Sequence, residues 1–209
     1  VFCFNFRADR MRQMVRALVI DRFDGFDTSP RPRVELVTMT RYDATFPIPI
    51  AFEPFTLHRI VAEVLGNVGR TSLRTAETEK YAHVTYFFNG GVEVPYPGEE
   101  RILVDSQRVA TYDLKPEMSA PGVTDVLCRA IEQRDHDFIL CNYANGDMVG
   151  HSGVLPAAIR AVETVDECLG RALASAERAA AVVLVTADHG NCEMMIDPDT
   201  GGPHTAHTT

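Results

Sequence analysis

Apolar residues are arranged along this chain in two alternating patterns, short continuous runs and the three- and four-residue spacings of helices. The run at 181–185 is rich in β-branched residues and predicts a strand buried on both faces, and 137–141 predicts another buried strand. Further strands are expected at residues 1–6, 34–40 and 101–104. Helical spacing predicts helices at residues 9–20, 57–65, 120–131 and 155–174. Alternating strands and helices predict an α/β fold, a three-layer sandwich with parallel strands.

Three segments carry more specific expectations. The sequence "HVTYFF", "NGG", "VEV" (83–94) predicts a hairpin with a tight turn. Ser119 is expected to be the N-cap of a helix with Pro121 in its first turn. In the helix over 155–174, the spacing places the following residues toward the core: Ile159, Val162, Val165, Leu169 and Leu173.

The chain has room for one large or two small domains, since it contains 209 residues. The segment "PIPIAFEP" (47–54) has three prolines in eight residues, which is typical of an extended linker. We therefore predict a domain boundary near Phe55, with one domain over 1–54 and a second over 55–209.

Acidic and imidazole side chains gather where the predicted strands end. Asp188 and His189 follow the apolar run over 181–185, and Asp147 and His151 follow the run "DFILC". In open α/β sheets, ligands bind outside the carboxyl ends of the strands. The motif "HTAH" adds His204 and His207 in a loop after the last strand.

Each of these motifs alone has an ordinary structural explanation. An acid and a histidine four residues apart are common as a solvated helix pair, Asp188 fits a turn in which it accepts from backbone amides, and "HTAH" fits an exposed loop. Together they bring two carboxylates and at least three imidazoles to one rim, where unpaired charges would be costly. This combination favours a metal site.

The residue types limit the metal. Imidazole and carboxylate ligands without thiolate favour manganese, zinc, iron or magnesium, and the number of histidines disfavours a pure magnesium or calcium cage. Five ligands exceed one open catalytic site. Two ions about 4 Å apart, which stabilise both oxygens of a phosphoryl transfer, fit the set better.

Three basic residues are candidates for binding an anion. Arg7 and Arg10 in "FRADR" lie between a predicted strand and a helix start, where a cation opposes the helix dipole unless it binds an anion. The planar fork of arginine suits phosphate or carboxylate. Lys80 precedes a predicted strand beside acidic neighbours, and a lysine in such a stretch is commonly a surface residue.

Composition excludes some classes of protein. The net charge of -9 argues against a dedicated surface for nucleic acid or anionic membranes. The five cysteines are an odd number, are widely spaced and form no C-x-x-C pair, which indicates core positions in a reducing compartment. No apolar run is long enough to cross a membrane, and no signal peptide opens the chain. We expect a soluble cytoplasmic protein, and a monomer, that binds a small molecule.

Several motifs together resemble one family. They are "FNFRADR", "AETEKYAHVTYFFNGG", "ATYDLKPEMSAP", "NYANGDMVGH", "VTADHGNCEM" and "GGPHTAHTT". Their order and spread across the chain resemble the cofactor-independent (2,3-bisphosphoglycerate-independent) phosphoglycerate mutases of the alkaline phosphatase superfamily. The resemblance implies an alkaline-phosphatase-like α/β/α sandwich over 55–209, incomplete in this chain. It also implies that residues 1–54 are the C-terminal part of a second, substrate-binding α/β (transferase) domain.

The resemblance also implies roles for individual residues. Asp147, His151 and His207 match the ligands of one manganese ion, and Asp188 and His189 match ligands of a second. Arg7 and Arg10 match a pair that binds the substrate's phosphate or carboxylate, and Lys80 matches a catalytic lysine near the transferring phosphoryl group. His204 matches no family ligand.

The chain departs from the family pattern in two ways. Ala8 replaces the usual proline of "FRPDR". In the family, the nucleophilic serine, a further metal-binding aspartate and several substrate arginines come before the part that this chain matches. We therefore expect residues 1–209 to be inactive alone. The implied reaction interconverts 2- and 3-phosphoglycerate through a phosphoserine. Another phosphomutase or phosphatase of the superfamily and an inactive metal-binding fragment are the alternatives.

Overall fold

The computed structural model describes residues 1–21, 23–54 and 56–208. The chain divides into two compact units, Val1–Thr56 and Leu57–Thr209, and each is described by itself. Among the described residues, none of the helices combines the length and apolar character needed to cross a bilayer.

The first unit is built from two very short strands and one helix. Strand β1 (Phe2–Cys3) pairs in parallel with β2 (Val37–Thr38), so the strands expected at 1–6 and 34–40 are much shorter than predicted. Helix α1 (Asp9–Val19) ends one residue before its expected end. The buried core of this unit consists of Cys3, Ala8, Val15, Leu36 and Tyr42.

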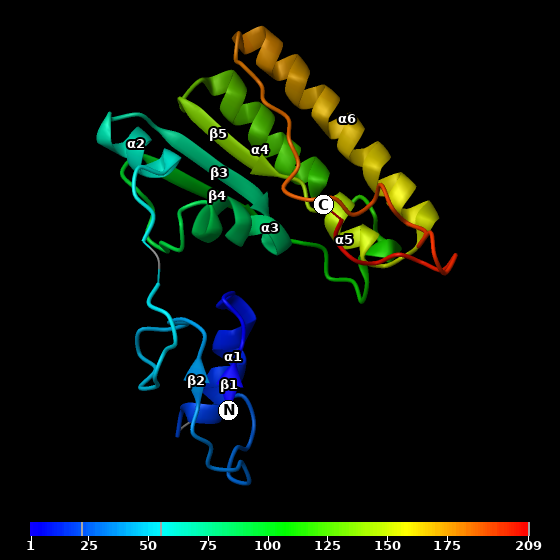
Figure 1. Ribbon diagram of the computed structural model, residues 1–209. Helices are drawn as coiled ribbons and strands as arrows, with labels where there is room; N and C mark the ends of the chain where they lie inside the picture. The colour runs from blue at the N-terminus through cyan, green and yellow to red at the C-terminus, as the bar shows by residue number, and fades with distance from the viewer. Residues whose placement is uncertain (22, 55, 209) are drawn as a thin grey trace. The chain divides into compact units, whose positions relative to one another are not determined.

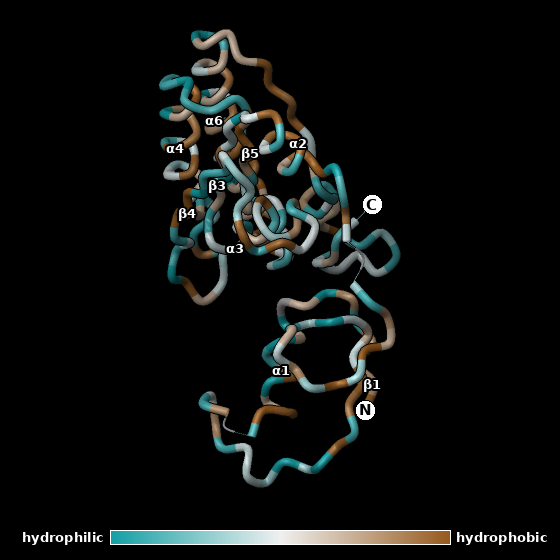
Figure 2. Tube along the Cα trace, turned by 90° about the vertical axis from the view of Figure 1, so that its left-hand side faces the viewer, coloured by the Kyte–Doolittle hydropathy of each residue, from teal (hydrophilic) through white to brown (hydrophobic). Residues whose placement is uncertain are grey.

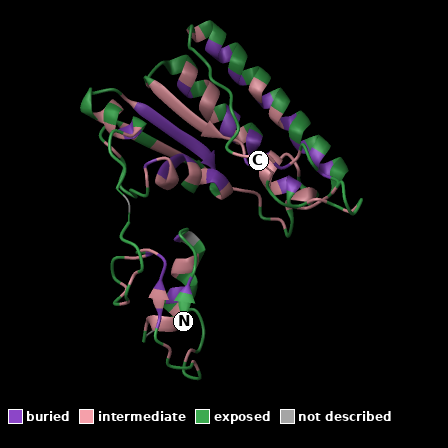
Figure 3. Ribbon diagram, viewed as in Figure 1, coloured by how far each residue is buried: buried purple, intermediate pink, exposed green. Residues whose placement is uncertain are grey.

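The second unit contains a parallel sheet of three strands, β3 (Ser72–Glu77), β4 (Glu99–Val104) and β5 (Phe138–Asn142), in the order β4-β3-β5 (Figure 1). The central strand β3 is buried at every position, as Figure 3 shows. The hydrophobic pattern missed β3 because its sequence, SLRTAE, mixes polar and apolar residues. A central position in the sheet, rather than apolar composition, makes it a buried strand.

Helices cover both faces of this sheet, which gives the expected three-layer α/β arrangement (Figure 1). On one face lies α4 (Ala120–Gln133), with α6 (Leu155–Ala179) packed against it. The other face carries α3 (Thr78–Ala82), which continues into a π-helix, η1 (His83–Phe87). The remaining helices are α2 (Val61–Asn67), the 3₁₀ helix η2 (Tyr112–Leu114) and α5 (Asn145–Gly150).

Helix α6 packs through small side chains instead of the large apolar residues expected. Its buried residues are Ala157, Ala158, Ala161, Thr164, Cys168, Ala172, Ser175 and Ala176. Ile159, Val162 and Leu173 were expected to point inward, but all three are exposed. The small residues let α6 approach α4 closely. Hydrophobic and hydrophilic positions alternate along α6 in Figure 2.

The predicted hairpin over 83–94 is wrong. Residues 83–87 extend α3 as a π-helix, in which the rings of His83 and Phe87 meet edge to face with centroids 5.3 Å apart. Gly90 and Gly91 do form a tight turn, with φ of 64° and 87°, but this turn ends a helix. Aromatic residues favour strands only as a tendency, and here packing of the rings outweighs that tendency.

The predicted strand over 181–185 is also absent. Among the described residues no strand pairs with this segment, and Val182 and Leu184 are 91% and 90% exposed. A strand needs a neighbour to bond its backbone groups. The apolar sequence alone does not provide one.

The buried centre of β3 yields a stability prediction. Leu73 is fully buried, whereas Leu114 is 67% exposed. We expect Leu73→Ala to lower the free energy of unfolding by about 2–5 kcal/mol because it leaves a cavity, and Leu114→Ala to change it by less than about 1 kcal/mol. Urea unfolding of both variants measures the difference, and equal losses would contradict the buried position of β3.

Candidate metal centre

Four segments of the second unit bring charged and imidazole side chains together beyond the carboxyl ends of the strands. Helix α3 follows β3 and carries Lys80, and α5 follows β5 and carries Asp147. The segment after 181–187 contributes Asp188 and His189, and the last residues contribute His207. This is the edge at which open α/β sheets bind ligands.

Asp147 lies at the centre of this group. Its Oδ1 atom lies 2.9 Å from Nε2 of His151 and 2.8 Å from Nε2 of His207. One ligand atom from each of the three residues lies within 4.8 Å of the other two. The side chain of Asp147 is 14% exposed, while those of His151 and His207 are 40% and 47% exposed, so the centre is open to solvent on the imidazole side.

Backbone carbonyl groups orient two of the imidazole rings. Nδ1 of His151 lies 2.6 Å from the carbonyl oxygen of Thr205, and Nδ1 of His189 lies 3.2 Å from that of Gly190. These contacts leave Nε2 as the ring nitrogen that faces Asp147 in both histidines. Metal-binding histidines are commonly held in this way.

Lys80 lies on the opposite side of Asp147. Its ammonium group is 2.7 Å from Oδ2 of Asp147 and 3.5 Å from Oδ2 of Asp188, and the lysine side chain is only 2% exposed. The expectation that such a lysine is a surface residue is therefore wrong. The ammonium group carries three protons and the described ion pairs give it two carboxylate oxygens, so at least one buried proton is left without one of these acceptors. One ammonium facing two carboxylates leaves excess negative charge.

His189 joins the cluster at a longer distance. Its Nε2 atom lies 3.9 Å from Oδ2 of Asp147 and 3.8 Å from Oδ2 of Asp188, and its ring stacks on that of His207 with centroids 3.8 Å apart. Asp188 and His189 thus lie next to the three-residue group. They share the Oδ2 side of Asp147 with Lys80.

The charges in the cluster shift the pKa values of both aspartates. Burial raises the pKa of Asp147, but the Lys80 ammonium and the two nearby histidines outweigh burial and lower this pKa to about 2. The pKa of Asp188 is also lowered. Burial alone would raise this pKa, but the charges of Lys80 and His189 outweigh burial. Both carboxylates are ionised at neutral pH and available as ligands.

The arrangement fits a divalent cation. Nε2 atoms of His151 and His207 lie 3.0 Å apart, so their lone pairs repel each other unless a proton or cation lies between them. The donor set of one carboxylate and two imidazoles suits transition metal ions better than calcium. Three protein ligands on a partly open surface leave coordination positions for a substrate oxygen.

Sequence reasoning missed three asparagines at this site. Asn191 donates through Nδ2 to Oδ1 of Asp147 at 3.3 Å, and Asn142 donates to Oδ2 of Asp188 at 3.5 Å. Asn145, fully buried, donates to the carbonyl oxygens of Pro116 and Glu117. Their positions in "NYANGD" and "DHGN" beside the acidic ligands were the available signal, because amides commonly orient carboxylates.

The other candidates lie apart from the three-residue group or in the first unit. His204 is half-buried, and its backbone N–H donates to the carbonyl oxygen of Met195. Arg7 and Arg10 are exposed residues of the first unit, at the end of the β1 segment and the start of α1. Their part in binding a substrate stays a prediction.

The fold and the cluster together define an α/β protein with a candidate metal-binding centre at the carboxyl ends of parallel strands. A family model described as "Metalloenzyme superfamily" matches residues 27–209, which is most of the chain. The chain therefore belongs to this superfamily. A second model, described as "BPG-independent PGAM N-terminus", matches residues 1–44.

Curated relatives are similar over the whole chain. The "2,3-bisphosphoglycerate-independent phosphoglycerate mutase" of Pseudomonas savastanoi pv. phaseolicola is 55% identical over 209 residues, which are 100% of this chain and 41% of that protein. The "2,3-bisphosphoglycerate-independent phosphoglycerate mutase 2" of Methanosarcina barkeri is also 55% identical, over 100% of this chain and 40% of that protein. The chain spans about two-fifths of the length of these relatives.

A solved structure shares the fold. The Leishmania mexicana phosphoglycerate mutase, determined at low cobalt concentration, matches with a TM-score of 0.87 and 35% identity over 100% of this chain and 40% of that one. The similarity agrees with the alkaline-phosphatase-like α/β fold and with the resemblance of the sequence motifs to the phosphoglycerate mutases.

Metal binding can be tested with one histidine substitution. We expect His151→Ala to weaken binding of Mn²⁺ to the chain by at least about tenfold, because it removes one of three ligands. His58, which is exposed and outside the cluster, provides the control His58→Ala. Isothermal titration calorimetry measures both. Equal affinities for His151→Ala and the unsubstituted chain would exclude His151 as a ligand.

The lowered pKa of Asp147 predicts how stability depends on pH. The folded-state pKa of about 2 lies below the ordinary 3.8, so the contribution of the ionised carboxylate is complete above pH 3.8 and is lost as the pH falls through 2. We expect the stability difference between the unsubstituted chain and Asp147→Asn to shrink by on the order of 2 kcal/mol over this range. Urea unfolding at several pH values measures it, and a constant difference would contradict the ion pair.

Proposed function

We propose that this chain is part of a cofactor-independent phosphoglycerate mutase, which interconverts 2- and 3-phosphoglycerate through a phosphoserine. The observation that carries this proposal is the convergence of Lys80 with Asp147, Asp188 and three histidines beyond the sheet. The named relatives, 55% identical over the whole chain, support the substrate. The nucleophilic serine is proposed to lie outside these 209 residues.

Two divalent cations, proposed to be Mn²⁺, fit the cluster. Asp147, His151 and His207 would hold the first, since their ligand atoms already lie together. Asp188 and His189 would contribute to the second, with the remaining ligands outside this chain. When bound, such ions stabilise negative charge on a transferring phosphoryl group and lower the pKa of a nucleophilic hydroxyl.

Lys80 is proposed to contact the transferring phosphoryl group. Its buried ammonium has at least one proton without a carboxylate acceptor, and a phosphoryl oxygen is an acceptor that would satisfy it. Lys80 therefore supplies a fixed positive charge that need not reorganise when charge develops on the phosphoryl oxygens.

Arg7 and Arg10 are proposed to bind the phosphate or carboxylate of the substrate. Arg7 precedes α1 and Arg10 lies in its first turn, where the backbone N–H groups of a helix also favour an anion. The remaining residues of the first unit, 1–54, are proposed to belong to a substrate-binding transferase domain, and residues 55–209 to a phosphatase-like domain. The segment 47–54, which lies near the end of the first compact unit, is proposed as the hinge between the two domains.

The cellular properties are proposed on the same basis. A glycolytic and gluconeogenic enzyme with a small-molecule substrate needs neither nucleic acid nor membrane partners. We propose a cytoplasmic monomer. All five cysteines are free, which suits a reducing compartment.

The substrate is tested on the intact protein. We expect conversion of 3-phosphoglycerate to 2-phosphoglycerate without added 2,3-bisphosphoglycerate, loss of activity on removal of metal, and a loss of at least about 100-fold in Arg10→Ala. The exposed Arg134 provides the control Arg134→Ala. Turnover of a pentose phosphate in preference to phosphoglycerate would support the alternative phosphomutase.

The fragment hypothesis needs a separate measurement. We expect the 209-residue chain to bind Mn²⁺ but not to convert phosphoglycerate, because the serine is proposed to lie elsewhere. Intact mass and metal content of the purified protein show whether further residues accompany this chain. Activity of the isolated chain at the level of an intact mutase would overturn the proposed location of the nucleophile.

A further inference from the structure

The position of Lys80 depends on the first turn of α3. This helix has only five residues, Thr78–Ala82. The side chain of its N-cap residue, Glu77, makes no capping hydrogen bond to the helix. A long lysine side chain loses considerable rotamer freedom when it is buried. The ion pair with Asp147 therefore requires that the backbone of this turn be held from outside the helix.

Ser106, in the loop after β4, holds this turn through three consecutive residues. Its backbone N–H donates to Oγ1 of Thr78 at 3.1 Å, and its Oγ atom accepts from the backbone N–H of Glu79 at 3.4 Å. The Ser106 hydroxyl donates in turn to Oε2 of Glu77 at 2.9 Å. The hydroxyl proton is thus directed by the Glu77 carboxylate, which leaves the oxygen lone pairs for Glu79.

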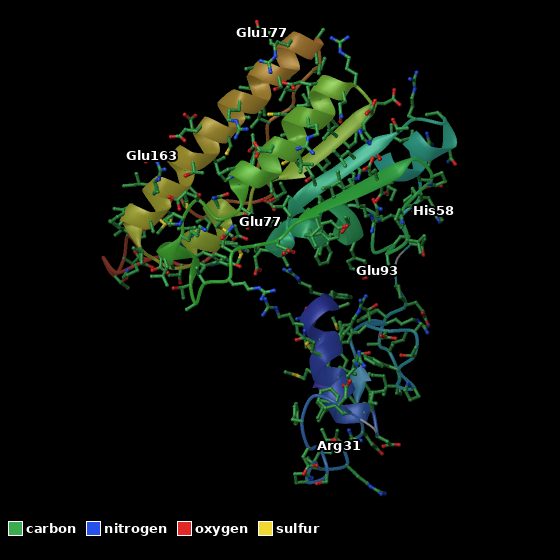
Figure 4. The ribbon with its side chains drawn as sticks, turned by 180° about the vertical axis from the view of Figure 1, so that it is seen from behind. Arg31, His58, Glu77, Glu93, Glu163 and Glu177 are labelled. Carbon is green, nitrogen blue, oxygen red and sulfur yellow. The ribbon has the colours of Figure 1, made fainter. Side chains whose placement is uncertain are left out.

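Glu77 is an unusual anchor because it is a buried acid without a cationic partner. It is 1% exposed, and among the ion pairs of the described residues none includes it. Figure 4 shows Glu77 at the end of the sheet. Burial raises the pKa of Glu77, while the hydrogen bonds from Ser106 and Ser119 act against this rise. Burying a carboxyl group without a cationic partner costs free energy, which its hydrogen bonds must offset.

The second oxygen of Glu77 reaches the start of α4. Oε1 accepts from the backbone N–H of Ser119 at 3.3 Å, and the hydroxyl of Ser119 donates to the carbonyl oxygen of Asp105 at 2.7 Å. Ser119 occupies the predicted N-cap position, but its side chain bonds this loop instead of capping α4. Glu77 therefore ties both ends of the loop over 105–119 to the end of β3.

The same loop also holds the element that carries Asp147. Asn145, in the first turn of α5, donates through Nδ2 to the carbonyl oxygens of Pro116 at 2.8 Å and Glu117 at 2.9 Å. Met118 of the loop packs with Val149 of α5 in one buried cluster. The loop is thus bonded to α3 on one side and to α5 on the other.

We propose that Glu77 is a positioning residue that holds Lys80 against Asp147 by fixing the loop over 105–119 between α3 and α5. Among the described residues no hydrogen bond or ion pair joins Glu77 to either side chain, and Glu77 acts through Ser106 and Ser119. The consequence for phosphoryl transfer rests on the proposed function. The positioning itself does not, because it concerns the contact between two residues of this chain.

The chain allows a direct measurement because Lys80 and Lys115 are its two lysines. Lys115 is exposed but lies in the loop over 105–119, so an added lysine-containing reference peptide provides the standard. Brief labelling with acetic anhydride, followed by peptide mass spectrometry, gives the rate at Lys80 relative to that of the reference peptide. We expect Lys80 to be protected in the unsubstituted chain. In Glu77→Gln its relative labelling rate should rise by about tenfold as the turn opens locally.

Three further variants separate positioning from general loss of stability. Ser106→Ala removes the link but keeps Glu77, and should also raise labelling, so the test remains decisive if Glu77→Gln fails to fold. Val123→Ala creates a cavity under α4, where Val123 is 1% exposed, and should lower the melting temperature without releasing Lys80. Glu167→Gln, on the exposed surface of α6, should change neither quantity.

The outcomes are distinct. Release of Lys80 in Glu77→Gln and Ser106→Ala, but not in Val123→Ala, supports positioning. Continued protection of Lys80 in Ser106→Ala, or equal release in Val123→Ala at the same loss of melting temperature, overturns it. Labelling needs no catalysis, so failure of the mutase assay would refute the proposed function and leave this result unaffected.

Discussion

The candidate site depends on the buried ion pair between Lys80 and Asp147. An ammonium group that is 2% exposed is costly to remove from water, and the nearby carboxylates compensate for that cost. The two oxygens of the Asp147 carboxylate also have different partners: Oδ2 faces Lys80, and Oδ1 faces His151 and His207. The geometry of the proposed metal ligands and of the proposed phosphoryl contact is thereby linked through a single side chain.

The elements around this pair explain how the fold can maintain it. Parallel strands place their carboxyl ends at one edge, so α3 and α5 begin near each other although they are distant in sequence. Backbone carbonyls of Thr205 and Gly190 then orient two imidazoles. Buried amide and hydroxyl groups complete the support, which is typical of sites whose geometry must be preorganised.

The sequence predicted much of the helical structure but only part of the sheet. Helix α4, helix α1 and strand β5 have strong apolar patterns and lie close to their expected positions. Strand β3 has no such pattern, and among the described residues no strand pairs with the apolar run over 181–185. Strand formation depends on a neighbour, so local sequence decides strands less reliably than helices.

The sequence by itself determined which chemical groups are present and which ends of elements carry them. Asp147, His151, Asp188, His189 and His207 were all named from spacing and residue type. Only the tertiary structure decided that Lys80 is buried against Asp147 and that asparagines support the acids. The reason is physical: these contacts join residues far apart in sequence, and their distances depend on how the strands and helices pack, which no local pattern records.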